Sequence, residues 1–480
     1  MLHVDKVDSL LTEKLKITAT GLVPFRCYKF YLKLHYHQGH FHSYCVIRSD
    51  EFGKIDLSKD KPIRGTYHDV DPMGLFISLQ ASQELRFGGS LRNDLAKPSL
   101  VSDSEKVLDE INLKKHWFHP LVTKIEVSQD GLYGTIFKPP GDGPFPCIID
   151  IPGANGKISN GVAAVYSLEG FLVYTLAFFD YKDLPKRCRD ADKHINFIQS
   201  LPYCSDKIGL YGMSLGGTIV NFLSTKHPEL SAVCSMNGPE SFYKPTALLK
   251  ENGKLMECEY FDHKLSININ GVIKQSPSFT AAFEKLKPET SIKWNQISEN
   301  ISFRIIVSFE GTATRQGNPR RSSGTATHQG KPRRTSELRN APRETATHMS
   351  TLDDWILDGV VNGSNVRRQL INSGHHVEVS NCAPPNFISR APLQIDYVPG
   401  GHLIYLPYYP HSSHTYNKFD RLSLGFGGEC TLHGKSQETI WENNFKFFKK
   451  VLGTPPSLPD YERDTVVVVP DSELKRDSKL

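Results

Sequence analysis

The sequence has little of what membrane-spanning and secreted proteins need. No stretch of its 480 residues approaches the roughly 20 consecutive apolar residues of a membrane-spanning helix. The first residues, MLHVDKVDSLLTEKLKI, lack the apolar core of a signal peptide. The nine cysteines are scattered singly, without the close pairs of a metal site, and several lie in apolar strand-like runs, as reduced buried thiols do. We therefore expect a soluble, intracellular protein.

The chain also lacks a strong charge imbalance. Its net charge of +5 is small for this length, and much of it lies in residues 311–350, so the remainder gives no reason to expect a nucleic-acid partner. In that segment GTATRQGNPRR at 311–321 recurs as GTATHQGKPRR at 324–334, with a partial copy at 344–348. A segment with almost no large apolar residues cannot offset the entropy of ordering it, so we expect a disordered insertion.

The remaining pattern predicts two folded regions. From about residue 14 to 120, apolar residues such as Phe30, Leu32 and Leu34 alternate with polar ones, which predicts a small antiparallel β-sandwich. After about residue 122, short apolar strands alternate with helical patterns, which predicts a mostly parallel α/β sheet closed by an amphipathic helix over QETIWENNFKFFKKVL. We predict a β-sandwich domain at 1–122, a catalytic domain at 123–455 and a mobile tail at 456–480.

One motif points to nucleophilic chemistry. In IGLYGMSLGG, Gly-x-Ser-x-Gly follows a strand pattern and precedes a helical one, as at the nucleophile turn of α/β-hydrolases. This places the hydroxyl of Ser214 above the sheet, with Gly212 and Gly216 permitting the close approach of strand and helix. The alternative is a glycine-rich loop that happens to contain a serine.

A serine nucleophile needs a histidine base and a carboxylate that orients the histidine. In α/β-hydrolases these residues follow in the order nucleophile, acid, histidine, on loops after later strands. Asp353 or Asp354, in TLDDW, and His402, after LQIDYVPG, occupy those places. Other candidates are less well placed. His375 and His376 precede the last strand and His411 and His414 lie farther along a loop, so we expect all four to be surface histidines. Asp396 lies inside the strand itself.

Catalysis would also need donors for a developing oxyanion. The backbone N–H of Leu215, next to the nucleophile, supplies one, and the loop that follows the strand in CIIDIPGANG should supply another from near Ala154. The glycines at 153 and 156 suit such a loop and equally an ordinary turn.

Several motifs in order resemble a known family. FKPPGDGPFPCIIDIPG, GFLVYTLAFFDYKDLPK, IGLYGMSLGG and PGGHLIYLPYYP, with the earlier GTYHDVDPMGLFIS, are similar to the type-I acyl-CoA thioesterases and the bile acid-CoA:amino acid N-acyltransferases, from about residue 14 to 453. The resemblance implies a sandwich domain, an α/β-hydrolase domain and acyl-CoA substrates. It also implies a triad of Ser214, Asp354 and His402, the acid being the second of the paired aspartates.

The same resemblance implies hydrolysis, because the conjugating branch has a cysteine where this chain has Ser214. An acyl-serine ester is ready for attack by water, and this mechanism requires no metal or other cofactor. Two alternatives stay open: transfer of the acyl group to glycine or taurine, and an inactive acyl-CoA-binding relative whose acid the insertion at 311–350 displaces. About a dozen further residues around VEVSNCAPPNFISR also lengthen the path from acid to histidine.

Two further segments bear on substrate and location. The weakly patterned stretch at 240–300 either covers the site or is a plain excursion of the chain. The last three residues, Ser478, Lys479 and Leu480, match the address that the peroxisomal import receptor reads, so we expect a peroxisomal protein, with the cytoplasm as the alternative.

Overall fold

The computed structural model describes residues 1–36, 39–82, 95–101, 106–154, 156–178, 181–182, 192–244, 250–251, 254–309, 354–381, 393–417 and 422–461. The basic repeat at 311–350, Asp353 and the terminal tripeptide lie outside these ranges, so the predictions about them stay predictions. No helix within the described ranges has the length and apolar character needed to cross a bilayer.

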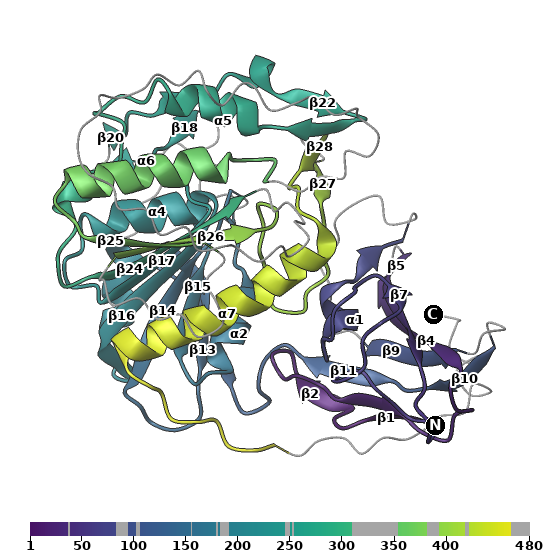
Figure 1. Ribbon diagram of the computed structural model, residues 1–480. Coiled ribbons are helices and arrows are strands. Elements are labelled where there is room, and N and C mark those ends of the chain that lie inside the picture. The colour runs from purple at the N-terminus through teal and green to yellow at the C-terminus, as the bar shows by residue number, and fades with distance from the viewer. Residues whose placement is uncertain are drawn as a thin grey trace, which may run out of the picture.

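The N-terminal region consists of two sheets around a shared apolar core (Figure 1). The smaller sheet has the order β1-β3-β6 and the larger has the order β2-β11-β9-β4-β5-β7, with β8 paired to β5 and β10 to β9. The strands are β1 (Leu2–Val4), β2 (Asp8–Leu10), β3 (Ile17–Ala19), β4 (Cys27–Tyr36), β5 (Gly39–Arg48), β6 (Ile55–Asp56), β7 (Arg64–Gly65), β8 (Gln80–Ala81), β9 (Leu95–Val101), β10 (Val107–Glu110) and β11 (Leu113–His116).

The alternation predicted for this region is present. Phe30, Leu32 and Leu34 are buried in the core, whereas Lys29, just before them, and Lys33, between Leu32 and Leu34, are partly exposed. The pairing is antiparallel except between β2 and β11, which run parallel. A short helix, α1 (Gly74–Ile77), lies beside β4 and β5.

The C-terminal region is built on a nine-stranded sheet in the order β12-β13-β15-β14-β16-β17-β24-β26-β25. Only β13 is antiparallel to its neighbours, and the remaining pairs are parallel. This is the α/β-hydrolase arrangement that the sequence predicts. Its strands are β12 (Thr123–Gln129), β13 (Leu132–Lys138), β14 (Phe145–Ile151), β15 (Leu172–Leu176), β16 (Cys204–Met213), β17 (Ala232–Met236), β24 (Ser302–Phe309), β25 (Val377–Asn381) and β26 (Leu393–Pro399).

Helices cover both faces of this sheet, so its strands are apolar on both sides. The helices α3 (Asp192–Gln199), α4 (Leu215–Ser224) and α6 (Gly359–Asn372) contribute to the core on one face. The helices α2 (Asn160–Ser167) and α7 (Cys430–Leu452) contribute to the core on the other. Figure 1 shows α7 running across that face.

Three details differ from the sequence prediction. The residues Val377–Asn381, treated as added loop length, form the edge strand β25, which pairs in parallel with β26. The closing helix begins at Cys430, where the carboxylate of Glu429 accepts the N–H groups of Thr431 and Leu432. The tail contacts the protein through Tyr461, whose hydroxyl donates to Asp8 Oδ1 at 3.2 Å.

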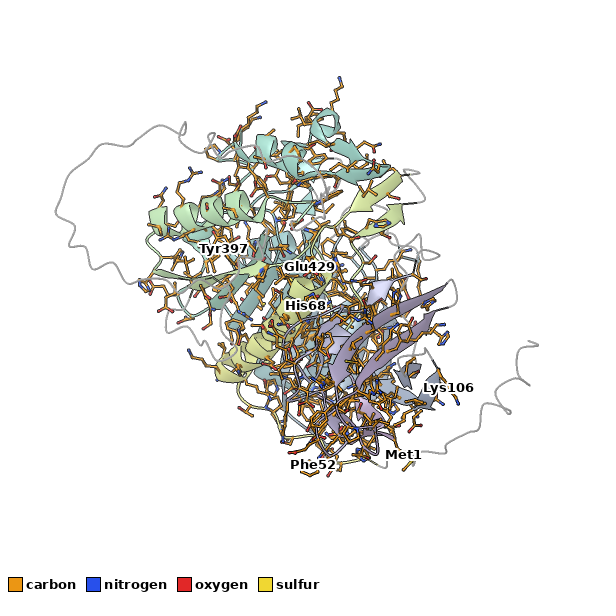
Figure 2. All side chains as sticks on the ribbon, turned by 45° about the vertical axis from the view of Figure 1, so that its right-hand side comes forward. Met1, Phe52, His68, Lys106, Tyr397 and Glu429 are labelled. Carbon is orange, nitrogen blue, oxygen red and sulfur yellow. The ribbon has the colours of Figure 1, made fainter. Side chains whose placement is uncertain are left out.

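The first turns of α7 join the two regions. A side chain at Gly434 would place its Cβ 2.2 Å from the carbonyl oxygen of Ile77, so only glycine permits this approach to α1. The Thr431 hydroxyl donates to Thr66 O at 3.0 Å. In Figure 2, the labels Glu429 and His68 mark this junction.

The connection between β17 and β24 carries a separate layer at the top of Figure 1. A four-stranded sheet in the order β22-β23-β28-β27 combines two strands of this connection with two from near the C-terminus. The four strands of this sheet are β22 (Ile267–Ile269), β23 (Val272–Lys274), β27 (His414–Asn417) and β28 (Leu422–Gly425). The connection between β17 and β24 also contains β18 (Tyr243–Lys244), β19 (Lys250–Glu251), β20 (Lys254–Leu255), β21 (Glu259–Tyr260), η1 (His263–Leu265), α5 (Ser276–Phe283) and η2 (Trp294–Gln296).

A buried ion pair crosses the central strands beneath α7. Arg304 Nε donates to Asp396 Oδ2 at 2.7 Å, and the two side chains are 2% and 0% exposed. Gln394 donates to the other carboxylate oxygen at 2.6 Å, and Asn444 accepts from the guanidinium. Asp396 is therefore a structural residue of β26.

Removing one partner of such a pair leaves an uncompensated buried charge. We expect Asp396→Ala to lower the free energy of unfolding by about 3–5 kcal/mol in urea titrations. The matched control is Glu126→Ala, which breaks the exposed 3.2 Å pair with Lys182 and should cost at most about 1 kcal/mol. Equal stability of the two variants would contradict this account.

Candidate active site

Ser214 lies at the turn between β16 and α4. Its backbone has φ 57° and ψ −125°, a conformation rare for residues other than glycine, and its N–H donates to Met236 O at 2.8 Å. A Cβ at Gly212 would lie 2.2 Å from Gly216 O, and one at Gly216 would lie 2.2 Å from Ile151 O. The serine is therefore on a tight strand-to-helix turn, and the glycine-rich-loop alternative does not describe it.

Ser214, His402 and Asp354 form one hydrogen-bonded chain. The distance from His402 Nε2 to Ser214 Oγ is 2.8 Å, and that from His402 Nδ1 to Asp354 Oδ2 is 2.9 Å. His402 and Asp354 are 2% and 3% exposed. The fold thus brings together three residues that are up to 188 positions apart in the sequence.

Asp354 is fixed by the backbone that follows it. Its Oδ1 accepts the N–H groups of Ile356 at 2.8 Å and Leu357 at 2.9 Å, leaving Oδ2 for His402. An isolated β-bridge also joins Asp354 to Gly427. The carboxylate of Asp354, the second of the paired aspartates, therefore faces the imidazole of His402.

The loop after β14 lies against the serine. A Cβ at Gly153 would lie 3.2 Å from Met213 O and 3.6 Å from Ser214 Cβ, so this loop and the next residue, Ala154, border the turn. Leu215 is the first residue of α4, where a backbone N–H has no partner within the helix and the helix dipole is positive. Both features suit an anion above Ser214.

The segment between β17 and β24 packs on the loop that carries the acid. Trp355 O accepts the N–H groups of Gln275 at 2.7 Å and Ser276 at 3.0 Å, at the start of α5. Apolar residues of the segment and of the acid loop share one cluster, which includes Phe261, Phe279, Phe283, Ile356 and Leu357. The segment is therefore integrated with the site rather than a plain excursion.

The other candidate histidines do not contact Ser214. His375 Nε2 lies 2.9 Å from Trp294 O, and His376 is exposed. His411 is half-buried: its Nε2 lies 3.0 Å from Gly428 O, and its ring centroid lies 4.0 Å from that of the buried His433. His414 begins β27, and its Nδ1 lies 3.2 Å from Ser413 Oγ.

Sequence reasoning missed the groups that hold the segment carrying His402. Gly401 N–H donates to His433 Nδ1 at 3.1 Å, and His402 N–H donates to Phe426 O at 2.7 Å. The ring of Phe426 also stacks on that of His402, with centroids 6.4 Å apart. No motif marks these residues, because their contacts arise only when α7 and the loop after β28 pack beside the sheet.

Among the described residues, no group of three or more His, Cys, Asp or Glu side chains is placed to hold a metal ion.

Comparison with known sequences identifies the family. The region described as "Acyl-CoA thioester hydrolase/BAAT N-terminal region" matches residues 12–129, and "BAAT / Acyl-CoA thioester hydrolase C terminal" matches 191–316 and 353–454. The chain belongs to this family. The second match is interrupted at 317–352, a gap that contains most of the basic segment at 311–350 that the sequence marks as an insertion.

Individual relatives carry both kinds of name. Bile acid-CoA:amino acid N-acyltransferase of Homo sapiens is 34% identical over 201 residues, covering 39% of this chain and 48% of that protein. Peroxisomal succinyl-coenzyme A thioesterase of Mus musculus is 28% identical over 243 residues, covering 47% and 57%. The chain thus spans about half the length of the relatives it matches.

Solved structures are more distant. An esterase from Pyrococcus furiosus is 10% identical and superposes with a TM-score of 0.34, covering 69% of this chain and 91% of the esterase. The fold assignment accordingly follows from the strand order of the sheet itself.

The paired histidines predict an acid-sensitive fold. Desolvation lowers the pKa of His411 to about 4 and holds the pKa of His433 well below 6.5. In the unfolded chain both would bind a proton near pH 6.5, so below that pH the unfolded state binds more protons. The free energy of unfolding should therefore fall from about pH 6.5 toward pH 4, by at most about 1.4 kcal/mol per pH unit for each histidine.

Urea titrations of the wild type and His411→Gln at pH 7 and pH 5 would measure this slope. The variant should lose less stability on acidification, whereas a control at the exposed His376, His376→Gln, should behave as the wild type. Equal slopes for the wild type and His411→Gln would rule out His411 as a source.

Proposed function

We propose that this protein hydrolyses acyl-CoA thioesters to a free acid and CoA. The observation that carries the proposal is the continuous hydrogen-bonded chain from Asp354 through His402 to Ser214. Membership in a family of acyl-CoA thioester hydrolases supplies the substrate class.

In the acylation half of the reaction, Ser214 Oγ attacks the thioester carbonyl carbon and His402 Nε2 takes its proton. Asp354 accepts the Nδ1–H hydrogen bond, which holds the imidazole in the tautomer that can act as a base and stabilises the imidazolium. The C–S bond then breaks, and the sulfur of CoA leaves as a thiol with the proton from His402. An acyl-serine ester remains.

In the deacylation half, a water molecule takes the place of the thiol. His402 removes a proton from the water as its oxygen attacks the ester carbonyl, and then returns that proton to Ser214 Oγ. The products are a carboxylic acid and the regenerated serine.

Both halves pass through a tetrahedral oxyanion, for which we assign two backbone donors. Leu215 N–H lies at the positive end of α4, and Ala154 N–H follows the glycine that abuts Ser214. Preorganised donors of this kind are worth about 3–4 kcal/mol each in transition-state stabilisation.

Transfer of the acyl group to an amino acid is the second candidate, because relatives of this chain bear N-acyltransferase names. The serine at position 214 favours hydrolysis, since an acyl-serine lacks the high-energy thioester that an acyl-cysteine would retain for attack by an amine. An inactive relative is disfavoured by the 2.9 Å contact between His402 and Asp354, which the insertion leaves in place.

Ser214→Ala should lower thiol release from acyl-CoAs by about 10⁴- to 10⁶-fold, because the nucleophile is lost. The assay uses a panel of acyl-chain lengths, with and without glycine or taurine. Free acid should form whether or not the amine is present.

The matched control is Ser224→Ala, at a buried serine of α4 whose hydroxyl donates to Asn221 O at 2.7 Å. It should retain turnover. Amide as the main product with glycine or taurine would favour the transferase, and serine-independent release would refute the triad mechanism.

We also propose a peroxisomal location, with the import receptor as a partner through Ser478, Lys479 and Leu480. The proposal is supported by the C-terminal tripeptide and by a relative named as peroxisomal. Deleting Leu480 should leave a fluorescently tagged protein in the cytosol. Continued import of the deletion variant would contradict this route.

A further inference from the structure

In the segment that carries His402, the backbone N–H and C=O groups of Gly401 and His402 all form hydrogen bonds. Gly401 N–H donates to His433 Nδ1, and Gly401 O accepts from Ser308 Oγ at 3.0 Å. His402 N–H donates to Phe426 O, and His402 O accepts from Asn237 Nδ2 at 2.7 Å. The position of the imidazole therefore depends on partners from four separate parts of the chain.

Asn237 is also bonded to a second of these partners, Ser308. Its Oδ1 accepts Ser308 N–H at 2.7 Å, and its Nδ2 donates to Ser308 Oγ at 2.8 Å as well as to His402 O. Asn237 and Ser308 are 1% and 0% exposed. The amide uses both of its donors and its acceptor, so it has a single orientation that satisfies all three bonds.

The same turn also holds the nucleophile. Met236 O, directly before Asn237, accepts Ser214 N–H at 2.8 Å, and Asn237 N–H donates to Ile306 O at 2.7 Å. Asn237 has φ 48°, a left-handed conformation that asparagine adopts more readily than most residues. Two consecutive residues at the end of β17 thus fix both the serine and the histidine.

We propose that Asn237 is a positioning residue that sets the distance between His402 Nε2 and Ser214 Oγ. This inference rests on the proposed function, because the distance matters only if the histidine activates the serine. Asn237 acts through the backbone of His402 and touches neither reacting atom. Its loss should therefore slow the chemical step while leaving the binding of acyl-CoA nearly unchanged.

Two variants test the role. Asn237→Gly keeps the left-handed backbone and removes the amide. Asn237→Asp keeps the shape and the acceptor for Ser308 N–H but, when ionised, has no donor for His402 O. The control is Asn444→Ala, which removes a buried asparagine of α7. Its side chain is hydrogen-bonded to Tyr166, Cys234 and Arg304. It should lose stability without losing turnover.

The readouts are kcat and KM for thiol release, the rate at which a fluorophosphonate labels Ser214, and the thermal unfolding temperature. A displacement of about 1 Å can cost about 100-fold in rate, so both Asn237 variants should lose about 10- to 100-fold in kcat and in labelling rate, with KM within about twofold. If Asn237→Gly does not fold, the isosteric Asn237→Asp decides.

The outcomes separate the two hypotheses. A wild type that reacts at Ser214, with folded Asn237 variants that match it in kcat and labelling rate, would overturn the positioning role and leave the proposed function intact. A loss of kcat of the same size in Asn444→Ala would also overturn it, since the effect would then be general destabilisation. A wild type that neither releases thiol nor becomes labelled at Ser214 would refute the proposed function and this inference with it.

Discussion

The arrangement of this site depends on four neighbouring parallel strands that end at one edge of a sheet. β16 ends next to Ser214 and β17 ends next to Asn237, while β24 and β26 lead toward Asp354 and His402. The carboxyl ends of parallel strands open onto the same crevice, so residues that follow different strands meet there even though they are far apart in sequence. The apolar cores on both faces of the sheet hold these ends in register.

This constraint explains why a long insertion before the acid is compatible with the triad geometry. The position of Asp354 is determined by residues that follow it or lie elsewhere: the N–H groups of Ile356 and Leu357, and the bridge to Gly427. Trp355 is tied to the start of α5 as well. Added loop length costs only about 0.6 kcal/mol for each doubling when the loop ends stay in place, so the insertion need not disturb the carboxylate.

Local patterns in the sequence predicted the parts of the structure that local chemistry determines. The alternation around Phe30 and the apolar runs of β14 and β16 indicated strands, and the glycines around Ser214 indicated the turn. Partners that meet only through packing left no such pattern. Asn237, Phe426 and His433 look like an ordinary turn residue, loop residue and helix residue, and the edge strand β25 has too short and mixed a pattern to be told from a loop.

The most direct test of this account is an experimental structure of the protein after reaction with an alkyl fluorophosphonate. We predict a covalent bond from phosphorus to Ser214 Oγ, with Asp354 hydrogen-bonded to His402 and the phosphonyl oxygen within reach of the N–H groups of Leu215 and Ala154. An adduct on another residue, or Asp353 in place of Asp354 beside the histidine, would contradict it.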